Sequence, residues 1–107
     1  MVDSTMSLDM IFGALADATR RDILKRVSRA EHTISELAQP YAMSLAAIAK
    51  HVSVLEKAGL ITKRRSGKEK VIQIQPKTLK VAAAYLSEYE KIWSARFDAL
   101  EKLLKEK

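Results

Sequence analysis

Apolar residues recur every three or four positions through most of the chain, which is the spacing of one face of an α-helix. This spacing predicts a first helix over 7–16 and a second helix that begins near Ala18. A short third helix is expected to begin after Thr33, because Thr33 and Glu36 fit the reciprocal pattern of a capping box, and to end at Pro40. The chain therefore opens with a run of short helices.

A fourth helix is predicted between Ser44, a residue type that caps helix starts, and Gly59, a residue type that often follows a helix end. Leu45, Ile48, Val52 and Leu55 follow at helical spacing, and Ile48, Val52 and Leu55 form its apolar seam. The residues opposite this seam are Ala46, Lys50, Ser53 and Val54, and Ala47 and His51 lie on one flank. Only half of this helix is apolar, so its other half is expected to be exposed.

The pattern changes from helix to strand after Gly59. Residues 60–65 and 70–74 are rich in β-branched side chains, and the second segment alternates polar with apolar positions. The residues between them, Ser66-Gly67-Lys68, form a turn sequence, so the two segments predict a small β-hairpin. Pro76 then suits the first turn of a following helix.

The last predicted helix, over 77–104, is longer than one small domain can cover. Its apolar stripe consists of Leu79, Ala82, Leu86, Tyr89, Trp93, Leu100 and Leu103. Arg96 interrupts the stripe, and Phe97 and Leu104 lie beside it. Such a helix is ~42 Å long, whereas a chain of this size has a radius of gyration of only ~13 Å. The stripe therefore predicts a second copy of the chain; the alternative is a terminal helix folded back over its own core.

The positive charge is concentrated in two segments, which indicates a polyanionic partner. The formal net charge is +6. Residues 20–29 carry five basic side chains against one acid, and residues 59–77 carry six against one. Such clusters are the expected footprint of a nucleic acid, although a solvated basic surface is the alternative.

Length and composition exclude several classes of protein. At 107 residues the chain has the size of a single domain. The absence of cysteine excludes disulfides, zinc ribbons and thiolate metal sites. The longest unbroken apolar run, over residues 81–86, is far shorter than the ~20 residues that span a bilayer. We therefore expect a soluble, cytoplasmic protein without a membrane partner.

Short helices with a tight break, followed by a basic hairpin, describe a mainly α, winged helix-turn-helix domain. The N-terminal half of the fourth helix is expected to enter the major groove of double-stranded DNA, where small and polar side chains allow close approach. The predicted contacts in this helix are Ser44, Ala46, Ala47, Lys50 and His51. The hairpin is expected to contact DNA through Arg64, Arg65 and Lys68, and Arg20 and Arg21 are expected to contact the backbone on the other side.

Residues 12–24, 34–38 and 43–61 closely resemble the ArsR/SmtB family of bacterial winged-helix repressors. The resemblance implies that the fourth helix reads a DNA operator, that the hairpin is the wing, and that the protein is a transcription regulator, usually a repressor. Residues 7–76 then form the DNA-binding core of a single domain, 1–107, and residues 77–107 its dimerisation helix. The implied homodimer interface consists of Leu8, Ile11, Phe12, Leu86, Tyr89, Trp93, Phe97 and Leu100.

The chain departs from the family where metal-responsive members bind their metal. It has no cysteine, its last helix has no histidine, and His32 and His51 lie in different elements. We therefore expect no family metal site and no cofactor. His51 is interpreted as a side chain that flanks DNA or caps a helix, and His32 as a solvated loop residue. Alanine also replaces a common family proline at Ala18 and at Ala46, which are mild changes.

Three alternatives to a simple DNA-binding regulator follow from the residue types present. Catalysis by Ser44 and His51 is excluded, because two turns of one helix separate them by ~10 Å. A winged-helix module that binds proteins instead of DNA remains an alternative. A repressor gated by a small apolar molecule is another, with Tyr85, Tyr89, Trp93 and Phe97 around the ligand at the dimer seam.

Overall fold

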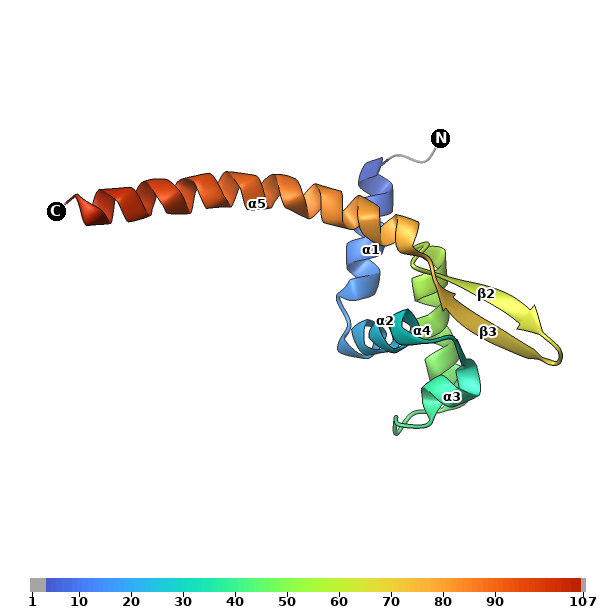
Figure 1. Ribbon diagram of the computed structural model, residues 1–107. Coiled ribbons are helices and arrows are strands. Elements are labelled where there is room, and N and C mark those ends of the chain that lie inside the picture. Colours follow the sequence, from blue (N-terminus) through green and yellow to red (C-terminus); the bar gives the residue numbers. More distant parts are fainter. Residues whose placement is uncertain (1–3, 107) are drawn as a thin grey trace.

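The computed structural model describes residues 4–106, with side chains from residue 8, and shows a mainly helical chain with one small sheet (Figure 1). The helices are α1 (Ser4–Leu15), α2 (Ala18–Arg29), α3 (Ile34–Ala38), α4 (Leu45–Lys57) and α5 (Pro76–Lys105). The strands are β1 (His32–Thr33), β2 (Ile61–Ser66) and β3 (Glu69–Ile74). Helix α1 begins before the predicted start at residue 7, and the side chain of Ser7 lies outside the described residues.

Short polar side chains start three of the helices, and the sequence predicts two of these caps, Thr33 and Ser44. Asp17 accepts a hydrogen bond from the backbone N–H of Arg20 at 3.0 Å, which also lowers the pKa of the Asp17 carboxyl. At the start of α3 the capping box is confirmed: Thr33 Oγ1 accepts from the Glu36 N–H, and Glu36 Oε1 accepts from the Thr33 N–H. Ser44 caps α4 by accepting from the Ala47 N–H at 3.1 Å.

Gly59 ends α4 in a conformation that other residues rarely adopt. Its φ is +78°, in the left-handed region. The N–H groups of Gly59 and Leu60 donate to the carbonyls of Glu56 and Leu55, so the last turn of the helix is closed. A Cβ at Gly59 would also lie 3.1 Å from Thr78 Oγ1 on α5, which leaves little space for a side chain.

The core lies between the first four helices and the sheet. It includes Ile23, Leu24 and Val27 from α2, Leu37 from α3, Ile48, Val52 and Leu55 from α4, and Leu60, Ile61 and Ile72 from the hairpin. Ile11 of α1 is only 1% exposed and belongs to this core. Its assignment to the dimer interface is therefore wrong, because the side chain has no free surface for a second chain.

The sheet has a third strand that the sequence pattern does not predict. The strand order is β1-β3-β2, and β1 pairs antiparallel with β3 through His32 and Thr33. The expectation that His32 is a solvated loop residue is wrong, because it lies in β1 half-buried and its Nδ1 donates to the Ala30 carbonyl at 2.7 Å. Two residues are too few to display the alternation that identifies a strand.

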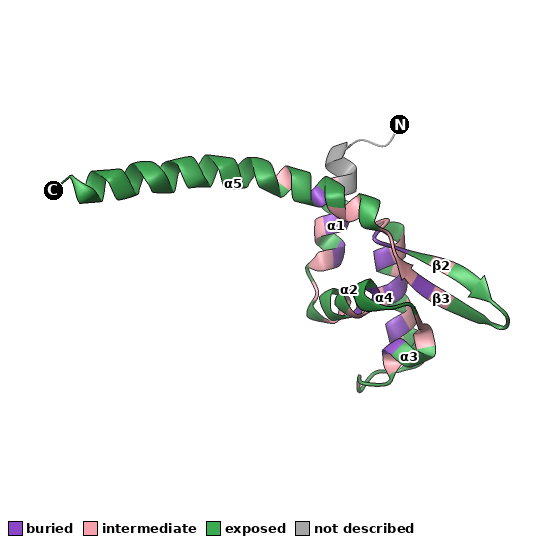
Figure 2. Cartoon of the chain, in the orientation of Figure 1, coloured by how far each residue is buried: buried purple, intermediate pink, exposed green. Residues whose placement is uncertain are grey.

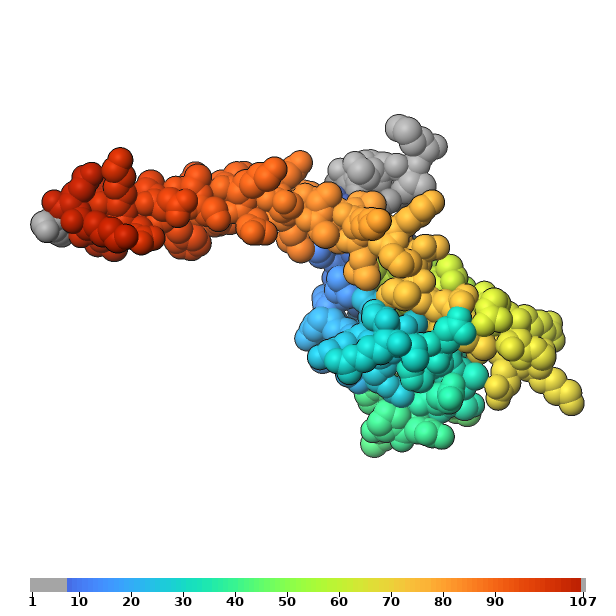
Figure 3. All heavy atoms as spheres, viewed as in Figure 1, coloured from blue at the N-terminus to red at the C-terminus, as the bar shows by residue number. Residues whose placement is uncertain are grey.

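Helix α5 stands away from the rest of the molecule as a single rod (Figures 2 and 3). The molecule extends over 67 × 36 × 20 Å, and its radius of gyration is 18.3 Å, against ~13 Å for a compact chain of this length. The alternative in which α5 folds back over its own core is therefore wrong. None of the described helices is both long and apolar enough to cross a membrane.

Candidate nucleic-acid interface

Helix α4 is fixed to the core by one side and exposes the other. Ile48, Val52 and Leu55 are fully buried, so they set the rotation of the helix about its axis. The polar side that the sequence predicts points outward: Ser44, Ala46 and Lys50 are exposed, and Ala47 and His51 are half-buried. The first two turns of α4 therefore present small side chains, one cation and the N-terminal end of the helix to a partner.

Leu45 follows the helical spacing of the seam but is not buried with it. Its side chain is 55% exposed at the first position of α4, next to Met43, which is also exposed. Helical periodicity aligns Leu45 with Ile48 and Val52, but the seam reaches the core only from the second turn onward. The structure thus adds an apolar side chain to the exposed start of α4.

The tip of the hairpin brings basic side chains together. In the antiparallel register of β2 and β3, Arg65 lies directly opposite Lys70. Side chains in such pairs are ~5 Å apart, and like charges there repel. Lys68 lies in the turn between the strands, after Gly67. Among the described residues, none of Arg65, Lys68 and Lys70 forms an ion pair with an acidic side chain.

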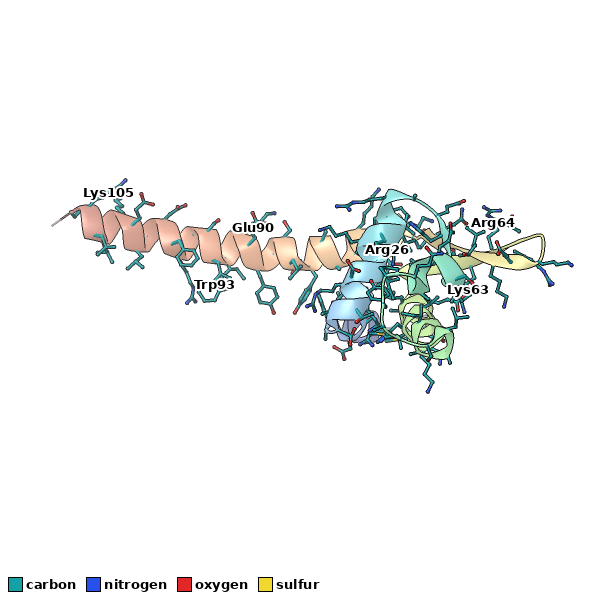
Figure 4. The ribbon with its side chains drawn as sticks, turned by 90° about the horizontal axis from the view of Figure 1, so that it is seen from below. Arg26, Lys63, Arg64, Glu90, Trp93 and Lys105 are labelled. Atoms are coloured by element: carbon teal, nitrogen blue, oxygen red, sulfur yellow. The ribbon has the colours of Figure 1, made fainter. Side chains whose placement is uncertain are left out.

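Acidic residues outside the hairpin form ion pairs with the basic side chains of β2 that lie farther from the hairpin tip. Lys63 Nζ lies 3.3 Å from Glu56 Oε1 on α4, and Arg64 Nη2 lies 3.1 Å from Glu31 Oε1. Gln73 Nε2 also donates to Glu31, so this carboxylate joins both strands to the turn after α2. Figure 4 shows Lys63 and Arg64 on opposite sides of the hairpin. Sequence reasoning missed Glu31, since a lone acid in a turn carries no recognisable pattern.

Arg20 and Arg21 donate to backbone carbonyls at the end of α1. Arg20 Nε donates to the Ala14 carbonyl at 2.7 Å, and Arg21 Nη1 donates to the Leu15 carbonyl at 2.9 Å. Arg20 Nη1 also donates to His51 Nδ1 at 3.3 Å, which ties α4 to the start of α2. These contacts give both arginines a structural role, and their contact with the DNA backbone stays a prediction.

Arg26 makes similar contacts at the end of α3. It donates to the carbonyls of Leu37 at 2.8 Å and Glu36 at 3.0 Å, and its guanidinium lies 5.7 Å from the ring centre of Tyr41. Tyr41 in turn donates to Asp22, and burial raises the pKa of its hydroxyl. Much of the positive charge of residues 20–29 therefore holds the helix-turn-helix together.

The apolar stripe of α5 is exposed where it leaves the body. Close to α1, Phe12 and Tyr85 have ring centres 5.9 Å apart, and the hydroxyls of Tyr85 and Tyr89 are hydrogen-bonded at 2.9 Å. Farther out, Trp93 and Phe97 are 52% and 61% exposed. The other exposed members of the predicted interface are Leu86, Tyr89 and Leu100, while Leu8 and Phe12 of α1 are half-buried.

The two histidines lie in separate elements, His32 in β1 and His51 in α4. The side chains of residues 8–106 contain no group of three histidine, aspartate or glutamate residues placed to hold a metal ion.

Two packed helices with a basic hairpin beside them define a winged helix-turn-helix domain, the architecture of many DNA-binding regulators. A model of a helix-turn-helix domain matches residues 15–64. The uncharacterised HTH-type transcriptional regulator YuzN of Bacillus subtilis is 48% identical in an alignment of 79 residues, and the match covers 67% of this chain and 86% of that protein.

Solved structures agree with this class. The ArsR family transcriptional regulator RHA00566 matches with a TM-score of 0.79 and 37% identity, over 88% of this chain and 97% of that one. The homodimeric winged helix-turn-helix domain of Mb0332 from Mycobacterium bovis shares the fold, with a TM-score of 0.66 and 22% identity over 80% and 82% of the two chains. The chain belongs to the ArsR family of helix-turn-helix transcriptional regulators. It is a DNA-binding regulator and not an enzyme.

Proposed function

We propose that the chain binds a double-stranded DNA operator as a homodimer in the cytoplasm and represses transcription there. The observation that carries the proposal is the wing tip, where Arg65 faces Lys70 across the hairpin and Lys68 lies between them. Mutual repulsion makes this tip unfavourable in the free protein, and the phosphates of DNA relieve it. A domain that binds only proteins has no need of such a charge cluster.

The start of α4 supplies the sequence-reading part of the proposed interface. Lys50 and the Ser44 hydroxyl offer hydrogen-bond donors to base edges or phosphates, and Ala46 and Ala47 allow the helix to approach closely. A second copy of α4, related by a two-fold axis, reads the other half of a palindrome about one helical turn away.

The homodimer is supported by the exposed stripe of α5. Large apolar side chains that stand free of the body, such as Trp93, Phe97 and Leu103, are typical of a surface that another chain covers. The homodimeric state of Mb0332, a domain of the same fold, agrees with this interpretation. The lack of cysteine and the separation of His32 from His51 support a regulator that works without the metal sites of its family.

Replacing Arg65 with alanine tests the wing. Affinity for random duplex DNA should fall, and the slope of log affinity against log salt should decrease by about 0.9 for each phosphate that the arginine neutralises in each protomer. Fluorescence anisotropy at salt concentrations from about 50 to 200 mM measures both quantities. Lys102→Ala, which removes the same charge from the exposed polar side of α5, is the matched control. An Arg65→Ala slope equal to that of the wild type and the control contradicts the wing assignment.

Leu45 is expected to contact thymine methyl groups, the apolar feature of the major groove. In a duplex selected from a random library, replacing a contacted thymine with uracil should weaken wild-type binding about fourfold, because one buried methyl contributes about 0.8 kcal/mol. The Leu45→Ala variant should bind both duplexes equally. Val54→Ala, which trims an exposed residue far from the start of α4, should keep the preference for thymine. Equal discrimination by the Leu45→Ala variant and the wild type contradicts this role.

A further inference from the structure

His51 lies on one flank of α4, on the side of the helix that faces the start of α2. With about 100° of rotation per residue, it is about 70° from the centre of the buried seam, whereas Lys50 is nearly opposite the seam. A helix in the major groove turns its outer side to the base edges, and its flanks face the phosphates that border the groove. The position of His51 therefore favours a phosphate as its partner.

The two ring nitrogens of His51 have different surroundings. Nδ1 lies 3.3 Å from Nη1 of Arg20, within hydrogen-bond distance. A guanidinium group can only donate, so Nδ1 accepts this bond and carries no proton. A neutral imidazole then holds its proton on the other nitrogen, Nε2. The hydrogen-bond partner thus assigns the tautomer of the ring.

Nε2 of His51 lies at the surface of the chain. In residues 8–106, no side-chain nitrogen or oxygen is both buried and without a hydrogen-bond partner. Within that part of the chain the hydrogen bond of the His51 ring is made by Nδ1, and the side chain is 21% exposed. The Nε2–H group is therefore a donor that an approaching partner can reach.

Arg20 is held in place by the end of α1. Its Nε donates to the Ala14 carbonyl at 2.7 Å, and its Nη2 donates to the Gly13 carbonyl at 3.3 Å. With Nη1 bonded to His51, each of the three guanidinium nitrogens has an acceptor within the protein. A cation bonded to Nδ1 polarises the ring, which makes Nε2–H a stronger donor to an anion.

Asp17 is the competing partner of the same ring nitrogen. Its Oδ1 lies 3.9 Å from Nδ1 of His51, too far for a hydrogen bond, and accepts from the backbone N–H of Arg20 at 3.0 Å. This backbone bond, together with the charge of Arg20, lowers the pKa of the Asp17 carboxyl, which favours its anionic form. Without the Arg20 side chain, the carboxylate would draw the ring proton to Nδ1 and leave Nε2 as an acceptor.

We propose that His51 donates from Nε2–H to a phosphate of the DNA backbone, and that Arg20 is the positioning residue that keeps His51 in the tautomer able to do so. Arg20, the ring and the phosphate then form one continuous chain of hydrogen bonds in each protomer. The inference rests on the proposed DNA binding. It adds the chemical group that His51 contacts and a role for Arg20 that acts through His51.

The location of the ring proton tests the role of Arg20. At about pH 8, where an ordinary imidazole is neutral, nitrogen–proton correlation spectra distinguish the protonated ring nitrogen from the bare one. The wild-type proton should be on Nε2, and in Arg20→Met it should move to Nδ1, beside Asp17. The matched control is Arg21→Met, which removes a similar bond, from Arg21 to the Leu15 carbonyl, and should leave the His51 proton on Nε2.

Substitution of the ring tests the phosphate contact. Glutamine places an amide N–H near the position of Nε2, whereas asparagine reaches only the position of Nδ1. In a duplex selected from a random library, methylphosphonates replace the phosphates one at a time. Wild type and His51→Gln should lose affinity about tenfold at one phosphate of each half-site, and His51→Asn and Arg20→Met less than about threefold there. At the other sensitive phosphates the four proteins should respond alike.

Each outcome decides the inference. A ring proton that moves only in Arg20→Met, together with one phosphate that only wild type and His51→Gln sense, supports it. A wild-type proton on Nδ1, or His51→Asn with the wild-type response at every phosphate, overturns it and leaves the proposed DNA binding intact. An Arg20→Met proton that stays on Nε2 overturns the role of Arg20. If Arg20→Met fails to fold, the two His51 variants decide alone. A wild type that binds no duplex even at low salt overturns both the inference and the proposed function.

Discussion

The dimer of the Trp93→Ala variant is expected to dissociate at least about thirtyfold more readily than that of the wild type. Trp93 is 52% exposed in the single chain and lies at the middle of the α5 stripe, which is the proposed dimer interface. Removing a large aromatic side chain from the centre of an interface typically costs about 2 kcal/mol or more, which is about a thirtyfold change. Operator affinity should fall as well, because a monomer contacts only one half-site.

Two further variants separate packing at the seam from a general effect of mutating α5. Trp93→Phe keeps an aromatic ring and should reduce the affinity only in part, whereas Lys102→Ala on the polar side should behave as the wild type. Sedimentation equilibrium gives the dissociation constants, and anisotropy with the selected duplex gives operator affinity. A Trp93→Ala variant that dimerises and binds the operator as tightly as the wild type would remove the basis for the α5 interface.

The Ile48→Ala variant is expected to lower the free energy of unfolding by about 2–4 kcal/mol. Ile48 is fully buried between α4 and the rest of the core, so alanine leaves a cavity behind the recognition helix. Urea unfolding at one fixed protein concentration measures the change, since dimerisation adds to the apparent stability.

Val54→Ala is the control for Ile48→Ala, because Val54 is on the same helix and 38% exposed. It should cost less than about 1 kcal/mol. Equal destabilisation of the two variants would contradict the burial pattern of α4 and with it the orientation of Ala46 and Lys50 toward DNA.

Local sequence signals predict the ends of the helices well. The Thr33–Glu36 capping box, the Ser44 cap and Gly59 each act within a few residues, and the structure confirms all three. The family is predicted equally well, because the resemblance to it depends on consecutive residues of the helix-turn-helix. The positions of Ala46 and Lys50 on the exposed side of α4 follow from helical periodicity alone.

Features that depend on distant neighbours were missed or misassigned. Leu45 fits the periodic seam, but no element covers the first turn of α4. Ile11 looks like any other apolar residue of α1, and only the packing of α1 against α2 and α4 shows that it is in the core. Strand β1 is defined by its pairing with β3 rather than by its own two residues.

The roles of the individual basic residues were the property that was hardest to predict from the sequence. A count of basic residues treats Arg20, Arg26 and Arg65 alike. In the folded chain, Arg20 and Arg26 donate to carbonyls at helix ends, whereas Arg65 stands at the wing tip opposite another cation. The difference arises because the helix ends whose carbonyls accept from Arg20 and Arg26 come close to these side chains only after folding.

The outer part of α5 extends from the molecule as a single helix, so its stability is expected to depend on protein concentration. Beyond the body the helix is stabilised mainly by its own backbone, and a free helix of about 15 residues is marginal in water. In the proposed homodimer, order at the outer end of α5 and pairing with a second chain are therefore expected to rise together with protein concentration. At low concentration the expected species is a single chain with a frayed outer α5 and one DNA-binding domain, and at high concentration it is a dimer that holds two such domains at a fixed spacing.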